Sequence, residues 1–428
     1  MRSIWVRIVF PDSITEATER LAYFTIGGSV AVVLVSVAAS QFLLAIAIPA
    51  SLWMLMRKGK CVLPSYPFAL PLVLFFLWTV VVALLSGETQ LNLIALKKFF
   101  ICAILLLVPL TVRGPGANLL IYRWIFFFAL CSSIRGIEQY IVNPNSDLLH
   151  RITGFMGQWM TFSGLLMLVL VALLAYILCY GWRKSRWIIP AAIICAVPLV
   201  LSLTRNAWLG TIVGLTIVLA LLRPRAIAVL ALALVAAYLL LPQDVRQRAQ
   251  TALDPTDPNT RNRIELFETA VRVIQDNPWI GVGQKGVKPA ALKNRGSLEY
   301  PDWMYQHMHN NFLQIAAERG IPGLLLWLWL MVRLALDAWR VYRVARRACG
   351  DDMEEDKKEA LATSVAALGA CGALLFAGLF EYNFGDSEVL TLFLFMMSAP
   401  YVYLRGQAAD DKTIPVAASG AGAAPGCF

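Results

Sequence analysis

A short run of histidines and asparagines has the clearest potential for chemistry in this sequence: His307-Met308-His309-Asn310-Asn311. A helical pattern follows it to Arg319, where Gly320 ends the pattern, and Pro322 starts the next helix. His309 is therefore predicted near the N-terminal end of a short helix. A neutral imidazole there can accept a proton near physiological pH, so His309 is a candidate general base with Asn310 beside it.

The elements that must position these residues are predicted to be transmembrane helices. Of the 428 residues, 59% are hydrophobic and only 15% are charged. Apolar runs recur along almost the whole chain, each close to the roughly 20 residues that cross a bilayer. A helix also satisfies the backbone groups that lipid cannot. The predicted fold is an all-α integral membrane protein with about twelve transmembrane helices.

Basic residues predict the orientation of these helices. They cluster in every second loop, as at 57–60, 183–186 and 340–347, and cytoplasmic loops are the ones enriched in Lys and Arg. Both termini are thus predicted in the cytoplasm, and the net charge of +10 reports topology and not a nucleic-acid partner. The predicted organisation is helices one to nine in 1–241, one large loop on the outer side containing short helices in 242–320, helices ten to twelve in 321–404, and a cytoplasmic tail in 405–428.

Some cations lie on the predicted outer side, where topology does not require them. They are Lys97, Lys98, Arg135, Arg151 and Arg205. Basic groups at or inside the membrane face are costly and usually have a specific anionic partner. The set predicts an anionic ligand at the outer face, although Arg135 could instead pair with Glu138, and the lysines could contact anionic lipid.

The predicted outer loop is too long for a passive turn and is expected to be functional. Ile264, Phe267, Val271 and Ile274 fit one face of a helix that begins near Arg263. This helix could lie on the membrane surface or cap the helix bundle. The segment 281–283, Gly-Val-Gly, then predicts a tight turn whose exposed amides, beside Lys285, suit a phosphate.

The loop gives little sign of a metal or a disulfide. It contains no cysteine, and it shows no compact cluster of His, Asp and Glu. Asp254 and Asp257 could bind a metal, but each precedes a proline and is typical of a turn. The acidic residues of the last outer loop, Glu381, Asp386 and Glu388, are expected to be solvated, with contact to a substrate as the alternative.

These residues resemble the O-antigen ligase and polymerase superfamily of bacterial envelope glycosyltransferases. The resemblance rests on His309-Asn310 followed nine residues later by Gly320-x-x-Gly323, on the 277–283 turn after the Arg263 helix, and on Ser202-Leu203-Thr204-Arg205. Gln284-Lys285 departs from the family pattern, because many relatives continue with further small residues there. The resemblance implies a GT-C-like enzyme of the bacterial inner membrane with its active site on the periplasmic face.

The implied reaction transfers a glycan from undecaprenyl pyrophosphate to a sugar hydroxyl of lipid A-core, in lipopolysaccharide biosynthesis. Arg205 and Arg263, supported by Arg135 and Lys285, are expected to bind the donor pyrophosphate through charge-assisted contacts. His309 is expected to deprotonate the acceptor hydroxyl, whereas His307 has at most a supporting role and is expected to point elsewhere. Direct displacement inverts the anomeric configuration, and neither a cofactor nor a metal is expected.

Other functions stay open beside the ligase. The same resemblance covers an O-antigen polymerase and a protein O-oligosaccharyltransferase. A transporter of lipid-linked glycans would show internal repeats and ionisable residues near the middle of its helices, and neither is evident. A scaffold for envelope assembly would explain the helices but not the His-Asn motif beside outward-facing arginines.

Overall fold

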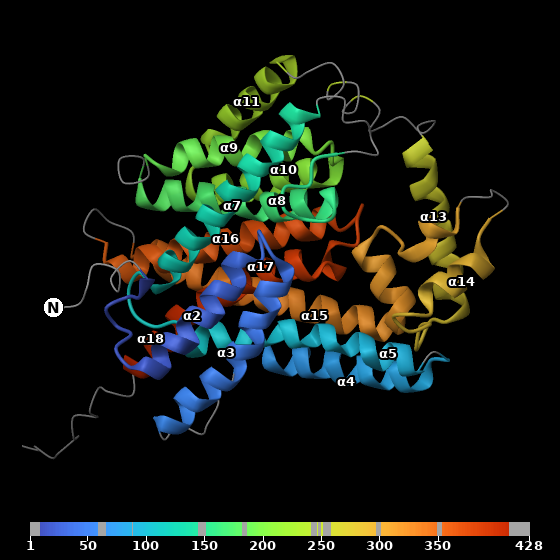
Figure 1. The fold of residues 1–428 in the computed structure, drawn as a ribbon, viewed down its shortest axis with the longest axis horizontal. Coiled ribbons are helices and arrows are strands. Elements are labelled where there is room, and N and C mark those ends of the chain that lie inside the picture. Colours follow the sequence, from blue (N-terminus) through green and yellow to red (C-terminus); the bar gives the residue numbers. More distant parts are fainter. Residues whose placement is uncertain are drawn as a thin grey trace, which may run out of the picture.

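The computed structural model describes residues 9–58, 66–87, 89–143, 151–181, 186–240, 246, 250, 258–296, 301–348 and 353–410, and these form helices joined by short connections. Figure 1 shows most of the long helices running side by side along the longest axis of the molecule. The helices are α2 (Ala17–Val32), α3 (Val37–Arg57), α4 (Ala69–Leu85), α5 (Thr89–Ala95), η1 (Leu96–Cys102), α6 (Ala103–Thr111), α7 (Ala117–Val142), α8 (Trp159–Tyr180), α9 (Ile188–Leu201), α10 (Arg205–Leu222), α11 (Ala226–Leu240), α13 (Pro258–Asp276), α14 (Val287–Asn294), η3 (Asp302–Gln306), α15 (Asn311–Arg347), α16 (Glu355–Ala377), η4 (Asn383–Gly385), α17 (Ser387–Ser398) and α18 (Pro400–Asp410).

The prediction of a helical membrane protein is confirmed for the described part of the chain. Eight helical segments there are long and apolar enough to cross a membrane, and one of them joins α5, η1 and α6 as Gln90–Thr111. Three further apolar helices, α4, α9 and α11, are shorter, and α2 has 16 residues. Length and composition support eight crossings, whereas the sequence predicted about twelve. The difference corresponds to these four shorter helices.

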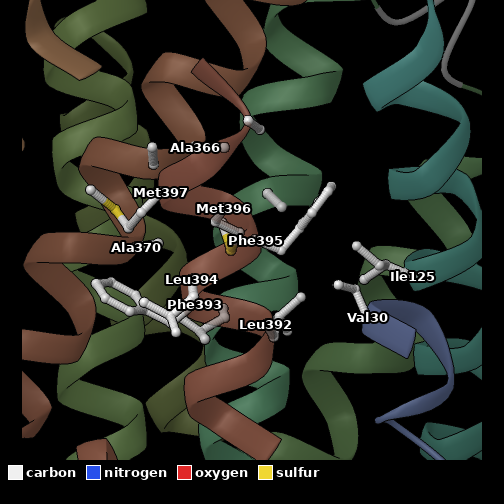
Figure 2. Packing of buried hydrophobic residues seen from close by; sticks show 14 of the residues in the cluster. Val30, Ile125, Ala366, Ala370, Leu392, Phe393, Leu394, Phe395, Met396 and Met397 are labelled. Carbon is white, nitrogen blue, oxygen red and sulfur yellow. The ribbon is translucent and has the colours of Figure 1, made fainter. Parts of the chain in front are cut away.

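The core of the bundle lies where α16 and α17 meet α8, α2 and α7. Figure 2 shows buried side chains of α17 between Ala366 and Ala370 of α16 and the pair Val30 and Ile125. Small residues bring α10 and α16 together, because a Cβ on Gly210 would lie 2.9 Å from the carbonyl oxygen of Ala373. Gly210 and Gly214 form a GxxxG pattern in α10, and this pattern allows the close approach known from membrane helices.

Helices α13, α14 and η3 form a cap on one end of the bundle. In Figure 1, α13 and α14 lie beside the N-terminal part of α15. They share a small apolar core with η3, to which Leu266, Ala270 and Val273 of α13 contribute. The predicted helix after Arg263 is present and caps the bundle through this face, while Ile264 and Phe267 stay half exposed.

A kink at Gly320 divides α15 into two helices. Gly320 adopts φ 68° and ψ 178°, so Asn311–Arg319 changes direction before the membrane segment begins. The turn that follows α13 holds this kink, because the amides of Val282 and Gly283 donate to the carbonyl oxygens of Ala317 and Glu318 at 2.9 Å each. The prediction that these amides are exposed and free for a phosphate is therefore wrong. They complete the helix end instead.

Candidate functional site

His309 and Glu381 form the centre of the candidate site. The Nδ1 atom of His309 lies 3.0 Å from both carboxylate oxygens of Glu381, a residue of the segment between α16 and η4. Glu381 is 4% exposed, so the expectation that it is solvated is wrong. A carboxylate on Nδ1 places the ring proton there and leaves Nε2 with a free electron pair.

The asparagines after His309 fix it against the Glu381 segment. Asn310 is the N-cap of α15, and its side chain accepts hydrogen bonds from the amides of Phe312 and Leu313 while donating to the carbonyl oxygen of Leu379. The buried Asn311 side chain donates to Asn383 Oδ1 at 2.7 Å. The supporting role expected for Asn310 is thus a structural one, shared with Asn311: both bring the two halves of the site together.

The backbone of His309 itself is strained. Its φ is +44°, and Leu203 is the other non-glycine residue with a positive φ in the part of the chain that the structure describes. A non-glycine residue in the left-handed region costs of order 1–3 kcal/mol, and such residues cluster at functional sites. The Asn310 cap and the Glu381 contact hold His309 in this conformation.

His307 lies against His309, contrary to the expectation that it points elsewhere. The two ring centroids are 4.1 Å apart, and His307 Nδ1 is 3.9 Å from Glu381 Oε1. Burial, together with the neighbouring His309, lowers the pKa of His307 to about 4. This ring is therefore neutral at physiological pH and can serve as a polar contact without adding charge.

Arg263 of α13 lies near the Glu381 carboxylate, and Arg205, the first residue of α10, lies near Arg263. Burial lowers the pKa of the Arg263 guanidinium, Glu381 raises it, and the like charge of Arg205 lowers it again. Burial works to raise the pKa of Glu381, but His309, His307 and Arg263 together hold it at about 2. Two arginines predicted from distant parts of the sequence are thus neighbours of each other, and Arg263 is the one beside the carboxylate.

The other predicted cations have different surroundings. Arg135 forms an ion pair with Glu138 at 2.8 Å, which is the alternative that the sequence left open, and both line a separate pocket with Arg151. Lys285 is exposed and lines the pocket that His307 and Glu381 also line. Asp254 and Asp257, the candidate metal ligands, lie outside the described residues.

The cluster also has the composition of a metal site. His307, His309 and Glu381 each offer one ligand atom, and these atoms lie within 4.8 Å of one another. The sequence showed no such cluster in the loop, because the third group comes from beyond α16. Two imidazoles and a carboxylate suit a divalent transition metal, so metal independence stays a prediction to be tested.

The sequence missed Glu381 because no local signal distinguishes it. It stands in a loop with other acidic residues, and its distance of 72 positions from His309 hides the contact. The available signal was the pair Asn310-Asn311, whose side chains bind the 379–384 segment. A helix cap that also carries a second asparagine indicates a docked partner, but not which one.

Comparison with known proteins finds relatives that are named as ligases. The chain is 27% identical over 187 residues to a protein of Rickettsia felis named as a polysaccharide ligase, covering 41% of this chain and 46% of that protein. It is 24% identical over 273 residues to a similarly named protein of Rickettsia conorii, covering 61% and 66%. It is 32% identical over 160 residues to the O-antigen ligase of Pseudomonas aeruginosa, covering 34% of each.

The chain thus spans less than two thirds of the length of each of these relatives. The family model described as O-antigen ligase matches residues 190–328, a region that includes Arg205, Arg263 and His309. The apolar helices describe a multi-pass membrane protein, and part of its chain is similar to proteins named as polysaccharide or O-antigen ligases. Over residues 190–328, this chain is similar to the O-antigen ligase family.

Proposed function

We propose that this protein transfers a glycan from undecaprenyl pyrophosphate to a sugar hydroxyl of lipid A-core. The observation that carries the proposal is the pairing of His309 with a buried carboxylate that lies near Arg263, which in turn has Arg205 as a neighbour. A base and an anion-binding group are the two parts that such a transfer needs. The ligases named among the relatives support the reaction class.

The reaction is a single displacement at the anomeric carbon of the donor sugar. The acceptor oxygen forms the new bond to that carbon, and the bond from carbon to phosphate oxygen breaks with its electron pair staying on the pyrophosphate. His309 Nε2 takes the proton of the acceptor hydroxyl, and Glu381 stabilises the imidazolium that forms. Arg205 and Arg263 neutralise the charge that grows on the leaving pyrophosphate.

The membrane arrangement belongs to the same proposal. We place the 242–320 segment and the site on the periplasmic face of the bacterial inner membrane, because the cytoplasmic loops are the basic ones. With α2, α4, α9 and α11 crossing in addition to the eight longer helices, the chain has about twelve crossings. The donor lipid then reaches the site from the outer leaflet.

The experiment compares wild-type protein, His309→Ala and the surface control Gln275→Ala in detergent. Each is given a synthetic polyprenyl pyrophosphate-linked glycan and lipid A-core, with and without a chelator. We expect His309→Ala to lose on the order of 10²–10⁴ in transfer rate with an unchanged unfolding temperature. The control and the chelator-treated wild type should keep full activity.

Each other outcome changes the proposal in a defined way. Undiminished transfer by His309→Ala removes His309 as the base. Growth of the glycan on the donor lipid, without transfer to lipid A-core, makes the protein a polymerase. Loss of activity in chelator that Zn²⁺ restores makes His307, His309 and Glu381 a metal site.

A further inference from the structure

A pocket of about 340 Å³ opens beside the histidine pair. His307 and Glu381 contribute to its wall, whereas neither Arg205 nor Arg263 lines it. Its volume falls in the range of about 300–1,000 Å³ that is common for small-molecule sites. The pocket therefore borders the Glu381 cluster, but neither arginine forms part of its wall.

Amide and carboxyl groups dominate the wall of this pocket. Gln158, Gln284, Gln306 and Gln314 come from four separate parts of the chain, and Asp386 adds a carboxyl group. Neutral amides donate and accept at the same time, as sugar hydroxyls do. Lys98 and Lys285 also line the pocket and suit a saccharide that carries negative groups.

Two buried polar atoms of the wall lack a hydrogen-bond partner among the described residues. They are Gln284 Oε1 and His307 Nδ1. A buried polar atom without a partner costs about 1–3 kcal/mol, so its presence in a pocket indicates a ligand that completes it. A sugar hydroxyl can donate to the Gln284 oxygen.

The backbone on both sides of Gln284 is fixed. The Gly283 amide donates to the Glu318 carbonyl oxygen at 2.9 Å, and the Lys285 amide donates to Asn92 Oδ1 at 2.8 Å. Gln284 therefore projects from an anchored turn into the pocket.

The direction of attack in an inverting displacement indicates whether the donor sugar or the acceptor sugar binds in this pocket. The attacking hydroxyl must approach the anomeric carbon from the face opposite the leaving pyrophosphate. The arginines are the proposed pyrophosphate site, so the acceptor must enter from a region that they do not line. We infer that this pocket is the acceptor-sugar subsite and that Gln284 is a specificity-determining residue for the acceptor; the inference rests on the proposed function.

Steady-state kinetics with each substrate varied in turn tests the inference. Gln284→Met keeps the length of the side chain and removes its oxygen, and Gln275→Met on the exposed face of α13 is the matched control. We expect Gln284→Met to raise KM for lipid A-core about tenfold, the effect of one lost hydrogen bond. KM for the donor should stay within about twofold, and the control should change neither value.

Binding without turnover separates this inference from the proposed function. Fluorescent lipid A-core is titrated into His309→Ala and into the double variant with Gln284→Met, and the second Kd should be about tenfold higher. If the Kd rises in this way but the wild type transfers no glycan, the acceptor subsite is supported and the proposed reaction is wrong. Equal Kd values, or a rise confined to the donor KM, overturn the acceptor subsite even if transfer occurs.

Discussion

At the scale of residues, the carboxylate of Glu381 gives His309 its direction. Both of its oxygens lie 3.0 Å from Nδ1, so the ring has one orientation and one tautomer. The arrangement is the base-and-orienter pair found in many hydrolytic and transfer enzymes. Its effect is to leave Nε2 of the neutral ring with a free electron pair that can accept a proton.

Glu381→Gln tests this role. The amide keeps the shape but removes the charge that stabilises a protonated imidazole, so we expect kcat to fall by on the order of 10–100-fold, less than on removal of the base itself. The acidic limb of the pH–rate profile should move to lower pH. Glu381→Asp should recover part of the rate. A loss of activity with an unshifted profile would give Glu381 a structural role only.

Asp386 gives a second prediction, about stability and pH. Burial, followed by the nearby charge of Glu381, raises the pKa of Asp386 to about 7, although Thr161 donates a hydrogen bond to it. The folded state then holds a proton that the unfolded state releases. Stability from this group is present below the ordinary pKa of an aspartate and is lost as the pH rises through about 7.

Asp386→Asn removes this pH dependence. The unfolding temperature of the variant minus that of the wild type should therefore increase between about pH 4 and about pH 7 and then level off. His307 changes stability with the opposite sign below neutral pH, but it is present in both proteins and cancels in the difference. A difference that stays constant with pH would contradict the burial of an uncharged Asp386.

At the scale of elements, the kink at Gly320 joins the short helix Asn311–Arg319 to the membrane helix that follows it. The sequence predicted this break from Gly320 and Pro322, because both residues are local signals. It could not predict what holds the break. The amides of Val282 and Gly283 hold the kink by hydrogen bonds to the end of the preceding helix. A turn of that composition is equally typical of a phosphate-binding loop.

Gly320→Ala tests how much the kink depends on glycine at this position. A Cβ at this position would overlap the carbonyl group of Trp279, and φ 68° with ψ 178° is a conformation that alanine avoids. We expect a loss of at least about 3 kcal/mol, seen as a lower unfolding temperature and low yield. Gly157→Ala, whose Cβ would meet nothing within 4 Å, is the control and should behave as the wild type.

At the scale of the whole molecule, the arrangement across the membrane decides which substrates can meet. Hydropathy and charge predicted the helices well, since each depends on a local run of residues. The cap formed by α13, α14 and η3 was only partly predicted, because its small core joins residues from 266 to 317. The buried face of α13 carries Leu266, Ala270 and Val273, whereas the apolar positions found by periodicity include the exposed Ile264 and Phe267.

Cysteine labelling tests the arrangement. The eight native cysteines are replaced, and single cysteines are introduced as Gln275→Cys on α13 and Lys357→Cys on α16. A maleimide that cannot cross membranes should label the first in intact spheroplasts and the second only after permeabilisation. Labelling of both from the same side would contradict the topology, and the reverse pattern would move the site to the cytoplasm.

The closeness of Arg205 and Arg263 also has a consequence for the catalytic cycle that we propose. When the glycan leaves, the carrier pyrophosphate gains a negative charge, so the two arginines hold the spent carrier more tightly than the loaded one. Each round of transfer then ends with an enzyme that is occupied by its own by-product. We expect escape of the spent lipid, rather than formation of the glycosidic bond, to limit turnover, so that a phosphatase acting on free carrier would speed the enzyme without touching it.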